Sequence, residues 1–420
     1  MNSVKTSAQF PTPEKSYVRW GLWLFLISAL LGASMRLFWV VELPFYEYTH
    51  VLHAHSHLAM LGWGFTVICT LFIFFLSPHL RHPKAYRRLL LTNVLVSLLM
   101  TAAFVVNGYT ILSISLLTAH LLIAYRIAYL LFYDLNKLPN KTAYVFGKWA
   151  IFWMIISTIG VWFLPVVIVN FGKLDPLYFA SIEFFLHLQF NGWFVYSVLV
   201  FLFLTLERKG ILLIVRNAEF WLLQLSLVLT YGLPAYWSYP IPILNYLNGI
   251  GVVIQLLVFG KIFLPVVKKW MNLKHEKADL SDVLINVGLL SLLIKTGIQF
   301  TLILPSFLAA SAEIRQFFIG FIHLIMLGVF TLTCLGVCLR FGLIPANKVS
   351  KAGLWMLMFG FVSTELVLFL QGILLWNSLG LLPFYPLVIL GFTIFLPVGL
   401  AFVIASYYSN SKNTTAISLH

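Results

Sequence analysis

The chain has 420 residues, of which 61% are hydrophobic and only 10% are charged, and its mean hydropathy is +0.96. Soluble globular domains carry about 25% charged residues, so this composition excludes a water-soluble fold and indicates a protein that lies in a lipid bilayer. The net charge of +14 is also typical of nucleic-acid-binding proteins, but here the basic residues cluster between long apolar segments.

Twelve apolar segments follow one another along the chain, each close to the roughly 20 residues that a helix needs to span a bilayer core. They are residues 18–41, 53–76, 88–110, 111–135, 143–168, 178–206, 212–232, 243–266, 281–304, 314–338, 351–375 and 382–408. Only residues 107–110 mark the boundary between the third and fourth segments. The sequence therefore predicts an all-α membrane protein in which residues 1–420 form a single polytopic domain of 12 transmembrane helices.

The basic residues lie mostly on one side of these predicted helices. With the N-terminus in the cytoplasm, all but five of the 27 basic residues fall in cytoplasmic segments; the exceptions are Arg36, Arg126, Lys173, Lys295 and Arg315. This asymmetry is the positive-inside rule. It predicts a multi-pass protein of the inner (plasma) membrane with cytoplasmic tails at 1–17 and 409–420. The lipid bilayer then explains the charge, and no nucleic-acid partner is needed.

A short motif recurs in the second, sixth and tenth predicted helices. Residues 57–63 read HLAMLGW, residues 187–193 read HLQFNGW and residues 323–329 read HLIMLGV. The shared element is H-L-x-x-x-G, and consecutive copies are four helices apart. The repeat predicts three pseudo-repeats of four helices each, at about 18–135, 143–266 and 281–408. The glycines favour close helix–helix contacts.

Seven histidines fall in the outer half or the middle of the predicted bilayer: His50, His53, His55, His57, His120, His187 and His323. An ionisable side chain in the membrane is costly, so it indicates a functional site by default. Metal ions and haem iron are common partners of neutral imidazole. At 100° per residue, His53 and His57 share one face of their helix and His55 lies on the opposite face. One helix can therefore serve two cofactors.

Other polar residues in the apolar segments allow two interpretations each. Glu183 and His187 lie on one stripe of the sixth helix, so Glu183 is either a proton donor or a hydrogen-bonding partner between helices. Lys295 on the ninth helix either conducts protons or pairs across helices. Arg36 and Arg315 lie at outer helix ends, where they either bind haem propionates or extend to the membrane surface.

This arrangement resembles the catalytic subunit of the haem-copper oxidase and nitric oxide reductase superfamily, in which histidines on helices two, six, seven and ten bind haem and a second metal. HAHSHLAMLGW (53–63) is similar to that superfamily's H-x-H element, although it lies in the second helix here. HLIMLGVFTLTCLGVCLR (323–340) is similar to a stretch of the related NnrS haem- and copper-containing membrane proteins. Two features depart from the superfamily pattern: the seventh segment has no histidine, and the tenth has one.

The resemblance implies roles for particular residues. His57 or His55, together with His323, would be the axial ligands of a low-spin haem b. His187, with His53 and in one version also His50, would bind a second metal such as copper, or a second haem. Glu183 would supply protons, and Arg36 and Arg315 would contact the haem.

The function that follows is redox handling of a small diatomic ligand, nitric oxide ahead of dioxygen, or the associated electron transfer. An electron-donor subunit or a quinol would be the redox partner, and the activity would be that of a nitric oxide reductase-like oxidoreductase. Two alternatives stay open: a transporter or metal-delivery protein that uses the intramembrane histidines, and a non-catalytic haem sensor or assembly factor. The transporter alternative is disfavoured because the three histidine motifs carry no Gly/Pro interruption.

Overall fold

The computed structural model describes residues 13–272 and 279–409, and within these ranges it contains helices and connections but no β-strand. Eleven of the described helical segments are long and apolar enough to cross a membrane. The prediction of an all-α, multi-pass membrane protein is therefore confirmed. Most of the predicted cytoplasmic tails, residues 1–12 and 410–420, lie outside the described residues.

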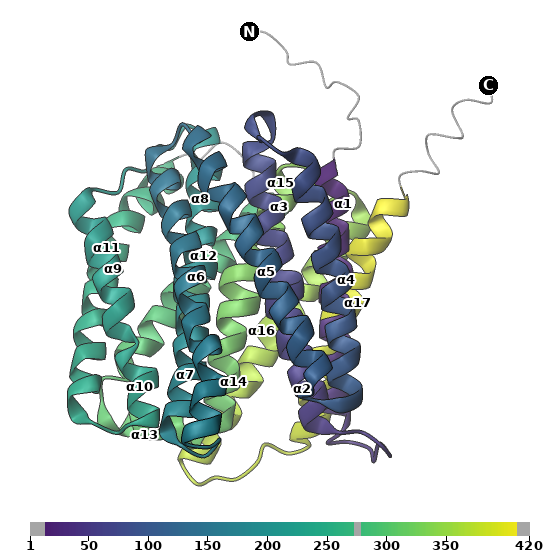
Figure 1. Cartoon of the computed structure of the whole chain (residues 1–420), viewed down its shortest axis with the longest axis vertical. Helices are drawn as coiled ribbons and strands as arrows, with labels where there is room; N and C mark the ends of the chain where they lie inside the picture. The colour runs from purple at the N-terminus through teal and green to yellow at the C-terminus, as the bar shows by residue number, and fades with distance from the viewer. Residues whose placement is uncertain (1–12, 273–278, 410–420) are drawn as a thin grey trace. The chain divides into compact units, whose positions relative to one another are not determined.

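Contacts within the chain divide it into two compact units. The first comprises Met1–Leu130, Cys338–Gly360 and Pro386–His420, and the second comprises Leu131–Val337 and Phe361–Tyr385. The helices that begin in the first unit's N-terminal segment are α1 (Pro13–Leu37), α2 (Tyr48–His57), α3 (Phe65–Leu76), α4 (Pro83–Asn107) and α5 (Ile111–Asp134). Here α1 packs against α2 and α3, and α2 packs against α4, as Figure 1 shows.

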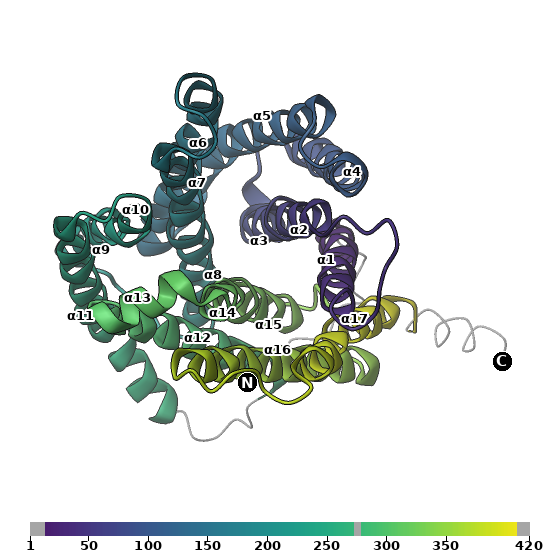
Figure 2. The same cartoon turned by 90° about the horizontal axis from the view of Figure 1, so that it is seen from below.

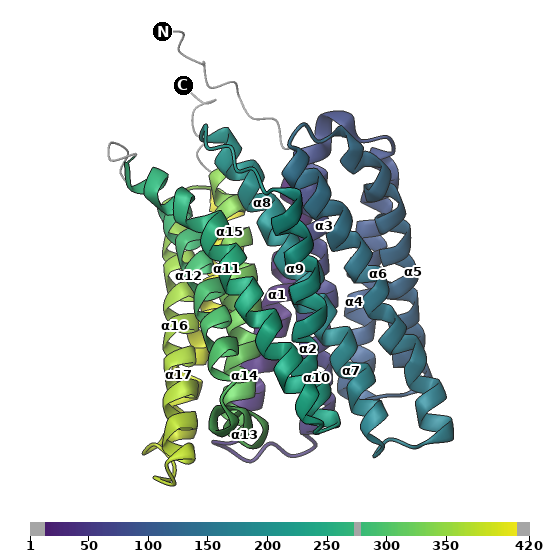
Figure 3. The ribbon, with the colours of Figure 1, turned by 90° about the vertical axis from the view of Figure 1, so that its left-hand side faces the viewer.

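The second unit contains most of the remaining helices. They are α6 (Lys141–Asn170), α7 (Pro176–Leu188), α8 (Val195–Arg208), α9 (Asn217–Thr230), α10 (Gly232–Ser238), α11 (Pro242–Asn272), α12 (Leu280–Thr301), α13 (Pro305–Glu313) and α14 (Arg315–His323). The last helices are α15 (Thr333–Arg340), α16 (Lys348–Trp376) and α17 (Tyr385–Ser409). Within the second unit α6 packs against α7 and α8, and α9 packs against α11 (Figures 2 and 3). The arrangement as three four-helix repeats stays a prediction.

The expected seventh helix, residues 212–232, corresponds to α9, which begins at Asn217 and ends at Thr230. After Tyr231 the chain continues as the short helix α10, which the sequence did not predict as a separate element. Pro234 has no N–H and so cannot continue the hydrogen bonds of α9 beyond Thr230. Gly232 lies directly against the backbone carbonyl of Leu244 on α11, where a side chain would clash. This local break explains why neither α9 nor α10 is long enough to count among the eleven candidate spans.

The weakly marked boundary at residues 107–110 is confirmed. Helix α4 ends at Asn107 and α5 begins at Ile111. Gly108 between them has a φ of 62°, a backbone conformation that favours glycine. A Cβ atom on Gly108 would also lie within 2.6 Å of the His50 imidazole. The glycine therefore allows both the turn and the close approach of this histidine.

In the part of the chain that the structure describes, three helices contain π-helical turns, and all three turns fall in the H-L-x-x-x-G motifs. They are η1 (Leu58–Gly64), η4 (Gln189–Phe194) and η5 (Leu324–Leu332). Two short 3-10 turns, η2 (Ser77–His79) and η3 (Leu135–Lys137), follow other helices. A π turn inserts one residue into an α-helix and occurs frequently at functional sites. The sequence repeat thus corresponds to a repeated distortion of the backbone.

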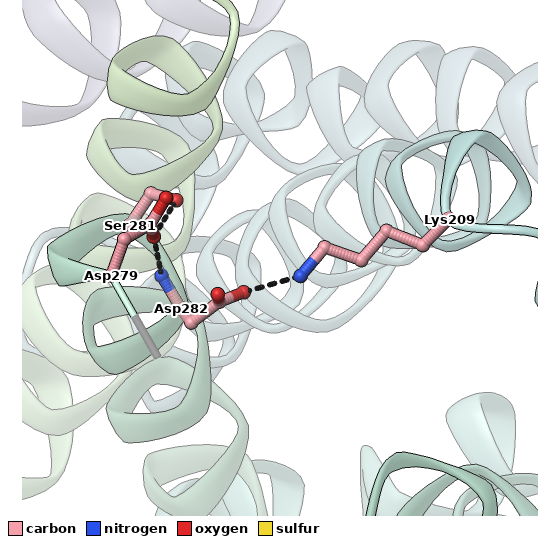
Figure 4. A network of polar contacts seen from close by, with 4 residues as sticks. All are labelled: Lys209, Asp279, Ser281 and Asp282. Carbon is pink, nitrogen blue, oxygen red and sulfur yellow. Dashed lines mark hydrogen bonds and ion pairs between the residues drawn. The ribbon is translucent and has the colours of Figure 1, made fainter. Parts of the chain in front are cut away.

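A polar cluster fixes the start of α12 against the end of α8 in the second unit (Figure 4). The Asp279 carboxylate caps the helix by accepting a hydrogen bond from the Asp282 backbone N–H at 3.0 Å, and it also accepts one from the Ser281 hydroxyl at 2.5 Å. The Lys209 ammonium, one residue beyond α8, forms an ion pair with Asp282 at 2.7 Å. These contacts determine where α12 enters the unit, and α12 carries Lys295.

Candidate functional site

The three motif histidines hold equivalent positions relative to the π turns. His57 is the last residue of α2, directly before η1, and His323 is the last residue of α14, directly before η5. His187 lies one residue further from its turn, since Leu188 ends α7 and η4 begins at Gln189. Each motif histidine thus lies at or next to the junction between an α-helix and a π turn.

One ring nitrogen of His57 is hydrogen-bonded to the backbone, and the other carries the lone pair that a metal ligand needs. Its Nδ1–H donates to the backbone carbonyl of His53 at 2.8 Å, and its ring stacks on Phe104 with centroids 4.7 Å apart. A neutral imidazole that donates through one nitrogen has a lone pair on the other. This Nε2 lies 3.4 Å from the Tyr109 hydroxyl, a long hydrogen bond. Anchoring of one ring nitrogen by a backbone carbonyl is the usual second contact of a metal-bound histidine, so His57 fits an axial haem ligand.

His53 and His55 point to different neighbours, as the helical spacing predicts. His53 packs edge-on against Tyr109, 4.7 Å between ring centroids, and lies 6.3 Å from His57. The His55 Nδ1–H instead donates to the backbone carbonyl of Ser28 on α1 at 2.8 Å, and its ring lies against Gly32 of α1. His55 has the same anchored geometry as His57 but faces another helix.

A fourth imidazole of the first unit, His120 on α5, is part of a buried hydrogen-bond network. Its Nδ1–H donates to the Asn93 side-chain oxygen at 2.7 Å. The Asn93 amide donates in turn to the Thr66 hydroxyl at 3.2 Å and to the Leu61 carbonyl in η1 at 3.4 Å. The sequence left the role of His120 open, and the structure connects it to the backbone of the π turn beside His57.

In the second unit both ring nitrogens of His187 have protein partners. Nε2–H donates to the backbone carbonyl of Leu227 on α9 at 2.8 Å, and Nδ1 lies 3.4 Å from the amide nitrogen of Asn191. The side-chain oxygen of Asn191 accepts a hydrogen bond of 2.6 Å from the ammonium of Lys295 on α12. The amino group of Lys295 therefore lies one side chain away from the only lone pair that His187 retains. This donor set does not fit a second metal site.

Glu183 lies one turn before His187 on α7, half-buried. Its carboxylate accepts a hydrogen bond from the Ser238 hydroxyl at the end of α10, at 2.9 Å. Tyr231, at the break between α9 and α10, donates its hydroxyl to the Ala180 carbonyl at 3.0 Å. The structure thus brings Glu183 together with the broken seventh element rather than directly with His187. Its predicted proton-transfer role stays a prediction.

The remaining predicted site residues lie at helix ends. Arg36 is in the last turn of α1 in the first unit, and Arg315 is the exposed first residue of α14 in the second. His323 is half-buried at the other end of α14. Their predicted contacts with haem stay predictions. Among the described residues, no group of three or more His, Cys, Asp or Glu side chains is placed to hold a metal ion.

Sequence reasoning missed two features of the site. The four-residue spacing places His187 and Asn191 on one face of the same span, but the link from Asn191 to Lys295 was missed, because Lys295 lies on a helix 104 residues further along the chain. The π turns were missed as well, although the H-L-x-x-x-G repeat marks all three of them. The sequence marked the π turns by a histidine that is followed by a glycine five residues later, in three copies.

Comparisons with known proteins agree with this architecture. No protein-family model and no curated protein sequence matches the chain. Among solved structures, the chain is similar to a haem-copper terminal oxidase that was studied as a dimer by cryo-electron microscopy. The TM-score is 0.65 at 14% sequence identity, and the match covers 95% of this chain and 84% of the oxidase chain. The two proteins therefore share a fold over almost the entire chain.

Proposed function

We propose that the protein is a membrane haem protein with a redox role of the haem-copper oxidase type, acting on a small diatomic ligand or in the electron transfer associated with it. The observation that carries this proposal is His57. Its Nδ1 is anchored to the backbone and its Nε2 retains the lone pair, within a fold shared with a haem-copper terminal oxidase.

Each proposed haem ligand lies at or near the end of a helix. His57, or His55 with the same anchored geometry, supplies an imidazole from α2, and His323 supplies one from the end of α14. Arg36 and Arg315 would offer positive charge to haem propionates. A bound haem would supply reversible one-electron chemistry, and its open coordination position, where present, would bind a diatomic ligand.

Nitric oxide is the preferred ligand ahead of dioxygen. The superfamily resemblance assigns ligands of the second metal to the sixth and seventh helices. Here the seventh element has no histidine, and both ring nitrogens of His187 are hydrogen-bonded within the protein. A second metal would therefore lack the ligands that the resemblance expects, and nitric oxide would bind at a haem iron that keeps one open position, not at the low-spin haem held by two axial imidazoles. Glu183 is the proposed proton donor, and a quinol or an electron-donor subunit is the proposed partner at the plasma membrane.

An optical spectrum of the purified protein tests the haem proposal. We expect b-type bands in the reduced-minus-oxidised difference after haem-replete expression, and we expect His57→Ala or His323→Ala to remove the low-spin bands. Two variants serve as controls. His79→Ala changes an exposed histidine of η2, and Tyr109→Phe removes the long hydroxyl contact to His57; both should keep the spectrum. Absence of haem from the wild-type protein would refute the proposal.

If haem is present, nitric oxide consumption separates an enzyme from a sensor. The reduced protein is mixed with nitric oxide, and the loss of nitric oxide is followed with an electrode. Turnover supports a nitric oxide reductase-like activity, with Glu183→Gln expected to slow it. Binding without turnover supports a sensor or an electron-transfer role instead.

A further inference from the structure

Three buried groups of the second unit form one directed chain of hydrogen bonds. The Lys295 ammonium donates to the Asn191 oxygen, the Asn191 amide nitrogen faces His187 Nδ1, and the His187 Nε2–H donates to the Leu227 carbonyl. Every link runs from donor to acceptor in the same direction. This polarity is consistent only with a neutral imidazole protonated on Nε2.

Lys295 is almost completely buried, with 1% of its surface exposed. It lies on a candidate membrane-spanning helix, and its hydrogen bond to Asn191 leaves two of its three N–H groups for other contacts. A lysine at such a position is rare and costly, and it indicates function by default. Its hydrogen-bond partner is the Asn191 amide, and Gln299, one turn further along the same face of α12, is also buried.

A metal ion at His187 would meet two obstacles. The only lone pair of the ring, on Nδ1, faces the Asn191 amide at 3.4 Å, so a metal would have to displace that group. The ammonium on the other end of the same amide would repel any cation placed there, and this repulsion is strong where water is excluded. Asn191 is also bonded to the His187 backbone carbonyl at 3.1 Å, which holds it in place.

We propose that Lys295 is the resident cation beside His187, in the place that the superfamily resemblance assigns to a second metal ion, and that His187 binds no metal. The Asn191 amide transmits the charge to the imidazole by hydrogen bonding. The second unit then holds a positive charge beside His187 without copper. The expectation of a metal at His187 comes from the superfamily resemblance, not from the proposed function, and this inference is tested independently of haem.

Elemental analysis of the full-length protein, expressed with added copper and haem, provides the test. We expect iron without stoichiometric copper in the wild type, and the same copper content in His187→Ala. Stoichiometric copper that is lost in His187→Ala would overturn the proposal. The haem proposal fails on the iron content and the optical spectrum instead, so the two failures are distinguishable.

A gain-of-function variant tests the position of the ammonium. Asn191→His combined with Lys295→His removes the cation and places two further imidazoles beside His187, enough ligands for copper or zinc. We expect this double variant to bind added copper, detected by elemental analysis and by electron paramagnetic resonance of Cu²⁺. The matched control is Asn191→His with Gln299→His, which keeps Lys295 and should bind none. Equal copper binding by the variant and the control would contradict the proposal.

Discussion

At the scale of single residues, hydrogen bonds distinguish the intramembrane histidines from one another. His55, His57 and His120 each donate through Nδ1 to an oxygen, which leaves Nε2 as the nitrogen with a lone pair. His187 donates through Nε2 and has its Nδ1 against an amide. The same residue type in similar apolar surroundings thus donates through Nδ1 in the first unit and through Nε2 at His187 in the second.

The Asn93 network gives a prediction at this scale. Asn93→Ala removes the acceptor of His120 and the donor to Leu61 and Thr66. A buried polar group left without a partner costs about 1–3 kcal/mol, so we expect a lower unfolding temperature in detergent. The control is Thr92→Ala. Thr92 is an exposed neighbour on the same helix, and its hydroxyl donates to the Arg88 carbonyl one turn earlier. An equal effect of both variants would show that the network does not stabilise the protein.

At the scale of helices, the π turn η5 lies in a close contact between helices. In the second unit η5 packs against α12, and the Phe194 ring of η4 meets the Phe330 ring of η5 edge-on at 4.8 Å. A Cβ atom on Gly328 would lie 2.6 Å from the Ser291 hydroxyl and 2.7 Å from the Phe361 ring. The motif glycine therefore allows the approach of α12, the helix that carries Lys295.

A glycine pair tests this contact. Gly328→Ala should destabilise the protein by about 1–3 kcal/mol, because overpacking forces neighbouring groups to move. Gly297→Ala on α12 is the control, since a Cβ there meets nothing within 4 Å, and alanine favours a helix over glycine by roughly 0.5–1 kcal/mol. Thermal unfolding in detergent measures both. The interpretation fails if Gly328→Ala is as stable as Gly297→Ala.

The start of α12 allows a second comparison between variants of one element. Asp279→Ala removes the N-cap of the helix, which costs about 0.5–2 kcal/mol. Lys209→Met removes the partly exposed ion pair with Asp282, and such pairs contribute about 0–1 kcal/mol because solvent screens them. We therefore expect the larger decrease in unfolding temperature for Asp279→Ala. A larger effect of Lys209→Met would show that the ion pair, rather than the cap, positions α12.

At the scale of the whole molecule, the distribution of basic residues predicts the orientation in the membrane. Leu174, in the predicted outer connection between α6 and α7, is 91% exposed, and Ile214, in the predicted cytoplasmic connection between α8 and α9, is 73% exposed. In intact cells a membrane-impermeant maleimide should label Leu174→Cys but not Ile214→Cys. The native cysteines Cys69, Cys334 and Cys338 are buried. Both variants should react in open membrane fragments, and the reverse pattern in cells would invert the topology.

The sequence alone determined the class of the protein, most helix positions and the opposite faces of His53 and His55. These properties follow from local physics, because the hydropathy of each segment and the 100° advance per residue need no information about neighbouring helices. The short helix α10 was missed, since the composition stays apolar beyond residue 232 and only Gly232 and Pro234 mark the break that separates it from α9. The π turns were missed for the same reason, because amino-acid composition does not show where the backbone hydrogen-bonding pattern of a helix changes.

The partners of the buried polar groups were decided only by the tertiary structure. His187 lies 40 residues from Leu227, its hydrogen-bond acceptor, and Asn191 lies 104 residues from Lys295. Hydrogen bonds are short and directional, so pairing depends on how helices pack to within fractions of an ångström. The H-L-x-x-x-G repeat marked the three positions, but packing decided that His57 keeps a lone pair for a ligand while His187 faces an amide that is bonded to a lysine.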